Sequence, residues 1–387
     1  MTKTFQPKFI QSKLPNTPTS IFSVMTQLAN QHGAVNLSQG FPDFEVDPKL
    51  IDLVMQAMQN GHNQYAPMAG VSNLRECIAE KYKHYYNLSI CPDNEITITA
   101  GGTQGLFTTI GALIEKGDEA IIFEPAYDSY KPSIESFGGI AVPIQLSAPD
   151  FVIDWQYVRT KITAKTKLII INNPNNPTGR LLSAIDILEL EEIVRDLGCY
   201  VLSDEVYEHL VYDGKMHISV LSSEILREKC FVAASFGKVL HTTGWKIGYV
   251  VAQTQLTREF RKLHQFNVFS VSTPMQYAVA AYLNDIQYYG NISKIFESKR
   301  NFLIESLENS RLKILPCEGT YFMLLDYADI SSENEYDFAK KLTVNHQIAT
   351  VPVSSFYSTE VNQCLLRLCF AKKEGTLSLA IDKLLRI

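Results

Sequence analysis

The stretch SFGK, residues 235–238, followed by TGWKIG, residues 243–248, places two lysines and several glycines between two short apolar runs. These runs, Phe231 to Ser235 and Ile247 to Ala252, predict β-strands. Lys238 therefore lies at a strand end beside Gly237 and aromatic residues, where partial loss of hydration lowers the pKa of an amine. Because a neutral amine can form a Schiff base with an aldehyde, we interpret Lys238 as a functional residue and not as a solvated surface lysine.

Outward from this stretch, residues 48–280 alternate short apolar runs with longer helical patterns. This alternation is typical of βαβ units and predicts an α/β fold with a mainly parallel sheet. The predicted strands are Ile96 to Ala100, Ala120 to Phe123, Leu168 to Asn172, Tyr200 to Ser203, Phe231 to Ser235 and Ile247 to Ala252.

The last hundred residues have a different pattern. A helical stretch from about 275 to 310 precedes two short strands, Tyr321 to Leu325 and Leu365 to Phe370, and a terminal helix. We therefore predict an N-terminal arm over residues 1–47 that packs with the small domain, a large domain over 48–280, and a small α+β domain over 281–387.

The composition is that of a soluble globular protein, with 46% hydrophobic and 20% charged residues. A formal net charge of -6 gives no reason to expect nucleic acid or an anionic membrane as a partner. The seven cysteines include no C-x-x-C pair, which favours reduced thiols, and the N-terminus lacks the apolar region of a signal peptide. We expect a cytoplasmic protein that acts on small molecules.

Polar residues follow the predicted strands one after another. They are Gly101 to Gln104, Tyr127, Asn173 to Gly179, Asp204 and Lys238. Because ligands of open α/β sheets bind outside the carboxyl ends of the strands, these residues predict a single site.

A phosphate is one ligand that this edge favours. Gly102 and Thr103 lie at a strand-to-helix turn, where backbone N–H groups and the helix dipole attract an anion. Ser235 and Lys246 are candidates for the same phosphate. A turn used only for packing, and a solvated lysine at position 246, are the alternatives. The stretch is neither a G-x-G-x-x-G motif nor a Walker loop.

The loop NNPNNPTG, residues 172–179, and the stretch SDEVY, residues 203–207, suggest a ring-shaped ligand. The prolines hold the loop rigid and project Asn176, although a simple turn is the alternative. Asp204 at a buried strand end needs a cationic partner, such as the protonated nitrogen of pyridoxal phosphate, unless it is only a helix N-cap. Tyr207 would donate to the 3-oxygen of that ring alongside Asn176.

Taken together, these residues resemble the fold type I aminotransferases, which depend on pyridoxal 5'-phosphate. The resemblance is strongest to the bacterial methionine aminotransferases and to the branch with kynurenine aminotransferases and glutamine transaminase. It covers essentially the whole chain, including the stretches NLSQGFPDF (36–44), NQYAPMAG (63–70), SDEVYEHL (203–210), LPCEGTYF (315–322) and LRLCFAKKE (366–374). It implies a large domain with a seven-stranded, mainly parallel sheet, plus a smaller α+β domain.

The resemblance also implies further roles. Tyr127 would stack on the cofactor ring, Arg367 would bind the substrate α-carboxylate, and Gly40 would help to hold it. Tyr65 would reach the phosphate of the neighbouring subunit, which implies a homodimer with shared sites. Lys246 lies where many relatives have arginine. The phosphate would therefore contact the compact ammonium group of lysine and not a guanidinium group that can donate two parallel hydrogen bonds.

The expected activity is transfer of the amino group of methionine, and of aromatic amino acids, to a 2-oxo acid. Phe22, Tyr65 and Phe269 are candidates for an apolar side-chain pocket. A kynurenine or glutamine transaminase, a cysteine-S-conjugate β-lyase and a cofactor-binding regulator without turnover remain alternatives. The histidines predict no metal site, and His209 is expected to be structural.

Overall fold

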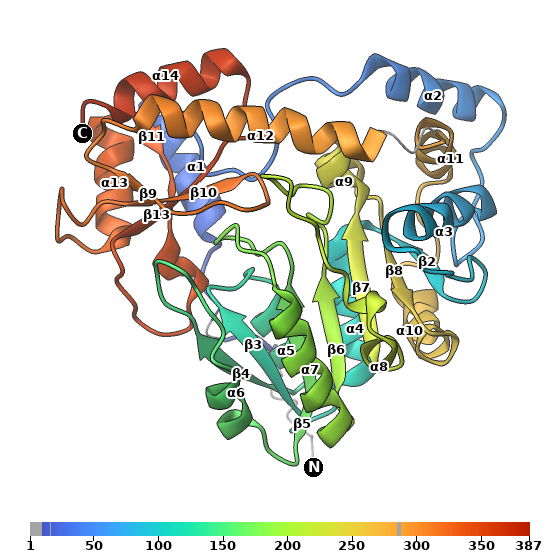
Figure 1. Cartoon of the computed structure of the whole chain (residues 1–387). Helices are drawn as coiled ribbons and strands as arrows, with labels where there is room; N and C mark the ends of the chain where they lie inside the picture. The colour runs from blue at the N-terminus through green and yellow to red at the C-terminus, as the bar shows by residue number, and fades with distance from the viewer. Residues whose placement is uncertain (1–9, 16, 285–287) are drawn as a thin grey trace, which may run out of the picture.

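The fold is built around a seven-stranded sheet with the strand order β2-β8-β7-β6-β5-β3-β4 (Figure 1). The computed structural model describes residues 10–15, 17–284 and 288–387, so the start of the predicted arm and residues 285–287 of the predicted helical stretch lie outside the described residues. The strands are β2 (Ile96–Thr99), β3 (Glu119–Glu124), β4 (Ile140–Gln145), β5 (Thr166–Asn172), β6 (Tyr200–Asp204), β7 (Cys230–Ser235) and β8 (Gly248–Ala252).

The sheet is mainly parallel, as the sequence predicts. Strand β8 is antiparallel to both of its neighbours, β7 and β2, while β3, β4, β5, β6 and β7 pair in parallel. The short connection between β7 and β8 turns the chain back, because a parallel pair needs a longer crossover. Edge strand β4 was not predicted. It contains Pro143, whose missing N–H is tolerated only at an edge or a bulge.

Both faces of the sheet are buried, which explains the continuous apolar run of β5. Ile169 and Ile171 belong to one hydrophobic cluster, whereas Leu168 and Ile170 belong to another. Helices α4 (Gly101–Leu113) and α10 (Thr254–Asn267) lie on the second face, and α7 (Ala184–Leu197) covers the first (Figure 1). A strand that is buried on both faces needs apolar residues at every position.

Local signals fix the ends of the covering helix α7. Ser183 and Asp186 form a capping box at its start, in which each side chain accepts a hydrogen bond from the other residue's backbone N–H. Gly198 ends the helix with a φ of 65°, in the left-handed region that favours glycine. The connection from β5 to α7 contains the NNPNNPTG loop, and the capping box at Ser183 therefore fixes where this connection ends.

A second, antiparallel sheet is formed by the C-terminal part of the chain in the order β12-β13-β10-β9. The arm joins it, because β1 (Val35–Asn36) pairs in parallel with β11 (Ile348–Ala349). Both C-terminal strands expected from the sequence are present, as β10 and β13. The elements are α1 (Ile21–His32), α12 (Tyr288–Leu307), β9 (Lys313–Ile314), β10 (Phe322–Asp326), α13 (Glu335–Asn345), β12 (Val351–Pro352), β13 (Leu365–Cys369) and α14 (Glu374–Leu384).

The remaining helical elements lie between the strands and helices already named. They are α2 (Pro48–Gln59), α3 (Ser72–Tyr86), α5 (Tyr130–Ser136), α6 (Trp155–Lys161), α8 (Glu224–Arg227), α9 (Phe236–Val239), α11 (Thr273–Tyr282) and 3-10 turns at Val220–Ser222, Thr243–Trp245 and Val353–Phe356. Within the described ranges, no helix has the combination of length and apolarity that crossing a bilayer requires.

Candidate active site

A cavity of about 440 Å³ lies at the edge of the large sheet where β2, β3, β5, β6 and β7 end. Because β8 is antiparallel, its amino end reaches the same edge and brings Lys246 there. Every residue predicted to hold the cofactor or the substrate carboxylate lines this cavity, except Tyr65. These residues are Gly40, Gly102, Thr103, Tyr127, Asn176, Asp204, Tyr207, Ser235, Lys238, Lys246 and Arg367.

Lys238 sits in α9, one turn beyond β7. Its Nζ atom lies 5.5 Å from the ring centroid of Tyr207 and 5.7 Å from that of Tyr321. Burial among these rings lowers the pKa of Lys238 to about 8. About a tenth of the amine is therefore neutral at pH 7 and available as a nucleophile.

Asp204 ends β6 and is almost fully buried. Its Oδ2 atom accepts a hydrogen bond of 2.7 Å from the hydroxyl of Tyr130, and its Oδ1 atom accepts one of 3.3 Å from the backbone N–H of Val206. Burial raises the pKa of Asp204 to about 6, while these hydrogen bonds oppose the rise. Sequence analysis missed Tyr130. Its place at the start of the helix that follows Tyr127, three residues on, is the signal that could have identified it.

The start of α4 needs glycine for two reasons. Gly101 has a φ of 77°, and a Cβ atom there would lie 3.2 Å from the Nζ atom of Lys246. Gly248 leaves room for the same turn, because its Cβ would lie 2.6 Å from the carbonyl oxygen of Ala234. Free backbone N–H groups, the helix dipole and the Lys246 ammonium thus surround a space that suits a phosphate.

Arg367 lies on β13 and is 1% exposed. Its Nη1 atom donates to Oδ1 of Asn176 at 2.8 Å, and its Nη2 atom donates to the carbonyl of Ser38 at 3.0 Å. The guanidinium carbon lies 4.0 Å from the ring centroid of Phe322. Burial lowers the pKa of Arg367 to about 10, so it remains cationic at neutral pH. Sequence analysis did not identify Ser38 or Phe322 as its neighbours.

Gly40 is part of the N-terminal arm and lies two residues after Ser38, whose carbonyl accepts a hydrogen bond from Arg367. Its carbonyl accepts a hydrogen bond of 2.7 Å from the hydroxyl of Tyr321. A Cβ atom at position 40 would lie 2.7 Å from the Cζ atom of Phe322, so the backbone can approach only because the residue is glycine. The arm therefore forms one wall of the cavity.

The three residues predicted for the substrate side chain are separated in the structure. Phe22 lines the cavity, whereas Tyr65 and Phe269 do not. Tyr65 is 83% exposed, and its ring meets that of Phe269 edge-on at 5.4 Å. The role of Tyr65 in a neighbouring subunit stays a prediction.

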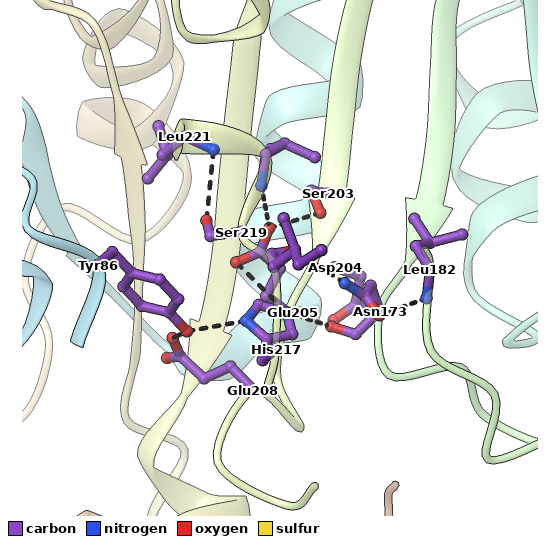
Figure 2. Close-up of polar contacts among 12 residues, drawn as sticks. Tyr86, Asn173, Leu182, Ser203, Asp204, Glu205, Glu208, His217, Ser219 and Leu221 are labelled. Carbon is purple, nitrogen blue, oxygen red and sulfur yellow. Dashed lines mark hydrogen bonds and ion pairs between the residues drawn. The ribbon is translucent and has the colours of Figure 1, made fainter. Parts of the chain in front are cut away.

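Behind the cavity lies a buried polar cluster that sequence analysis did not predict. Ligand atoms of Glu205, Glu208 and His217 all lie within 4.8 Å of one another (Figure 2). The Nζ atom of Lys81 donates to both carboxylate oxygens of Glu208, at 2.6 and 2.7 Å. An ammonium group therefore already occupies the position in which a metal ion would contact Glu208.

Comparison with known proteins gives consistent matches over nearly the whole chain. The family model for aminotransferase class I and II matches residues 32–384. The methionine aminotransferase of Escherichia coli K12 is 44% identical over 98% of this chain and 99% of its own length. Kynurenine–oxoglutarate transaminase 1 of Mus musculus is 32% identical over 92% of each chain.

Solved structures agree with these sequence matches. The crystal structure of YbdL from Escherichia coli, which identified a methionine aminotransferase function, superimposes with a TM-score of 0.96 and 43% identity, over 98% of this chain and all of the other. Aspartate aminotransferase of Thermus thermophilus gives a TM-score of 0.89 at 28% identity, over 98% of this chain and all of the other.

Proposed function

The chain belongs to the class I and II aminotransferases, and from this premise we propose that its amino donor is methionine and its acceptor a 2-oxo acid. Its membership of this family makes it a pyridoxal-phosphate-dependent transaminase. The observation on which the site assignment depends is that Lys238 and Arg367 line the same cavity. Lys238 offers an amine of lowered pKa, and Arg367 offers a cation that suits a carboxylate.

The residues of the cavity fit pyridoxal phosphate. The space at Gly101 that a Cβ would fill adjoins the Lys246 ammonium, which suits the phosphate, and the buried Asp204 carboxylate suits a cationic ring nitrogen. When bound, the cofactor supplies an aldehyde and an electron-withdrawing ring that stabilises negative charge on the substrate Cα. The residues proposed to hold it are Gly102, Thr103, Tyr127, Asn176, Asp204, Tyr207, Ser235, Lys238 and Lys246, with Tyr65 from a second subunit.

Different residues of the chain bind the substrate and move the proton during amino transfer. Arg367 and the backbone of Gly40 fix the substrate α-carboxylate, which orients the Cα–H bond. The Lys238 amine, neutral in part because its pKa is about 8, moves the proton from Cα. The rings of Phe22 and Phe322 beside Arg367 exclude water from this ion pair.

The lining of the cavity supports an uncharged substrate side chain. Among the described lining residues, Arg367 is the only arginine, so none is left to pair with a second carboxylate. The apolar wall at Phe22 and Phe322 favours a thioether or an aromatic ring. The similarity to kynurenine transaminases makes kynurenine a second candidate donor.

A panel of half-reactions tests the donor. Cofactor absorbance is followed after mixing the holoenzyme with methionine, kynurenine, phenylalanine, glutamine or aspartate. We expect methionine and the aromatic donors to react faster than aspartate, because the described lining residues include no second arginine to pair with a side-chain carboxylate. Fastest reaction with aspartate would contradict the assignment. Pyruvate and ammonia released from a cysteine conjugate without any acceptor would indicate β-elimination instead.

The same reasoning extends to assembly and location. An exposed aromatic pair, Tyr65 and Phe269, supports a homodimer in which each subunit completes the other's site. The free cysteines support a reducing compartment, which we take to be the cytoplasm. The division into an arm (1–47), a large domain (48–280) and a small domain (281–387) belongs to this proposal, and the pairing of β1 with β11 supports an arm that joins the small domain.

A further inference from the structure

Three short contacts connect the NNPNNPTG loop to the buried polar cluster through His217 (Figure 2). The Nε2 atom of His217 lies 3.1 Å from the carbonyl oxygen of Asn173, and its Nδ1 atom lies 2.8 Å from the hydroxyl of Tyr86. That hydroxyl lies 3.0 Å from Oε2 of Glu208. Each contact has hydrogen-bond length, so each needs one hydrogen.

Counting the hydrogens shows that His217 must supply two of them. Burial works to raise the pKa of Glu208, but the charge of Lys81 outweighs it and brings this pKa down to about 2. Glu208 is thus an acceptor only, and the single hydrogen of Tyr86 goes to it. The Asn173 carbonyl also only accepts. Both ring nitrogens of His217 must therefore carry hydrogen.

Glu205 supplies the balancing charge. Its Oε2 atom lies 3.9 Å from Nε2 of His217, while Oε1 accepts from Ser203 at 2.9 Å and from the backbone of Val220 at 3.1 Å. Burial lowers the pKa of His217 to about 4 and raises that of Glu205 to about 8. Between these values the pair holds one proton. Burial of each group taken alone favours the proton on Glu205, but the contacts of His217 with Tyr86 and Asn173 require it on the ring, because neither partner has a hydrogen left to donate. With Lys81 and Glu208 included, the four charges cancel.

The carbonyl that His217 contacts belongs to Asn173, the second residue of the NNPNNPTG loop. The backbone N–H of Asn173 donates to the carbonyl of Asp204 at 3.0 Å. The preceding residue, Asn172, donates to the same carbonyl at 2.8 Å and accepts from the backbone N–H of Asn176 at 2.7 Å. Asn176 in turn accepts from Arg367. Movement of this peptide would therefore displace the partner of Arg367.

We propose that His217, protonated on both ring nitrogens and balanced by Glu205, is a positioning residue that fixes the Asn173 carbonyl and thereby the Asn176–Arg367 pair. It touches neither cofactor nor substrate. The inference rests on the proposed role of Arg367 as the carboxylate binder.

A matched pair of variants separates the two contacts of His217. In His217→Gln, the side-chain amide nitrogen takes the place of Nε2 and still donates to Asn173. In His217→Asn, the shorter side chain places its amide near Nδ1 and keeps the contact with Tyr86 while losing that with Asn173. The probe is pentanoate, a carboxylate without an amino group, and its Kd for each holoenzyme is measured by calorimetry.

We expect His217→Asn to bind pentanoate roughly tenfold more weakly than wild type, the size expected for one hydrogen bond to a charged group, and His217→Gln to bind nearly as well as wild type. Thermal unfolding checks that both variants are folded. Equal binding by the two folded variants would overturn the positioning role. Failure of the wild type to bind pentanoate would instead overturn the role of Arg367 itself.

The protonation state has its own test on the unmodified holoenzyme. ¹⁵N NMR of histidine-labelled protein, with the His217 signals assigned by their loss in His217→Gln, distinguishes an imidazolium from a neutral ring. We expect two protonated nitrogens at pH 7, and their conversion to a neutral ring in Glu205→Gln. A neutral His217 in the wild type would contradict the proposal whatever the affinities of the two variants for pentanoate.

Discussion

Burial shifts the ionisation of two side chains at the site in opposite directions. It raises the pKa of Asp204 to about 6 and lowers that of Lys238 to about 8. At pH 7 Asp204 is mostly ionised and can pair with a cationic ring nitrogen, while a fraction of Lys238 is neutral. The hydroxyl of Tyr130 supports this state of Asp204 by donating to the carboxylate at 2.7 Å.

We predict that Tyr130→Phe weakens cofactor binding on the acid side. The lost hydrogen bond stabilises the ionised carboxylate, so its removal moves the pKa of Asp204 further above 6, by roughly one pH unit. Below that pKa the carboxyl group of Asp204 is neutral and cannot form an ion pair with the ring nitrogen. The fall in cofactor affinity on the acid side, here called the acid limb, should therefore move to higher pH. Titration of the apoenzyme with pyridoxal phosphate from acid to neutral pH measures this.

Tyr127→Phe is the matched control for this change. It also removes a phenolic hydroxyl at the site, but that hydroxyl lies 3.4 Å from Oγ1 of Thr103, whereas the hydroxyl of Tyr130 is the one that donates to Asp204. The acid limb should keep its position in the control. The same position in Tyr130→Phe would show that this hydrogen bond does not set the ionisation of Asp204.

At the scale of elements, the start of α4 and the amino end of β8 together form the side of the cavity that we propose to hold the phosphate. Gly101 opens the helix in the left-handed region, and Lys246, with a φ of 55°, ends a 3-10 turn beside it. The antiparallel direction of β8 is what brings Lys246 to this edge. Backbone geometry thus determines how closely an ammonium and a helix N-terminus approach each other.

We predict that Gly101→Ala weakens cofactor binding roughly tenfold, because the new methyl lies 3.2 Å from Nζ and Cε of Lys246 and displaces its charge. It also strains a residue at a φ of 77°, which costs about 1–2 kcal/mol. Cofactor titration and chemical denaturation measure the two effects separately.

Gly117→Ala provides the comparison for backbone strain. Gly117 has a φ of 92°, but nothing lies within 4 Å of the position that an added methyl would take, so this variant should lose stability without losing cofactor affinity. An equal loss of affinity in both variants would mean that strain, and not the position of Lys246, weakens binding at Gly101.

At the scale of the whole molecule, the cavity is closed by segments from both ends of the chain. The arm contributes Gly40 and Phe22, the large sheet contributes Asp204 and Lys238, and the C-terminal sheet contributes Arg367. The parallel pairing of β1 with β11 fixes the arm to the C-terminal part. Of the residues predicted to hold the cofactor or the substrate carboxylate, Tyr65 alone lies outside this cavity, and it is largely exposed.

A subunit-mixing experiment tests whether Tyr65 acts across a dimer. Lys238→Ala lacks the amine and Tyr65→Ala lacks the phosphate contact, so we expect each alone to have low activity. Refolded together, they should regain activity, because a mixed dimer contains one site with both residues intact. Light scattering confirms the dimer. Activity no greater than the sum of the separate variants would indicate that Tyr65 does not serve a neighbouring site.

The sequence by itself determined the strands of the large sheet other than the edge strand β4, and the polar residues that follow them. Apolar runs such as Leu168 to Asn172 and the polar residues at their ends are local patterns, and the parallel-sheet rule converts them into one site. The cavity indeed brings Asp204, Asn176 and Lys238 together. The resemblance added Arg367 and Gly40, whose neighbouring residues alone predict no role.

Only the tertiary structure decided which partners those residues have. Arg367 and Ser38 are 329 positions apart in the chain, and Lys81 on α3 reaches Glu208, which lies in the turn after β6. The hydrogen bond from Tyr130 to Asp204 and the contacts of His217 are also long-range. Local periodicity in the sequence shows which face of a helix or strand is buried. The partner of a buried polar group is decided only when distant segments pack together, because this packing removes the water that would otherwise bind the group.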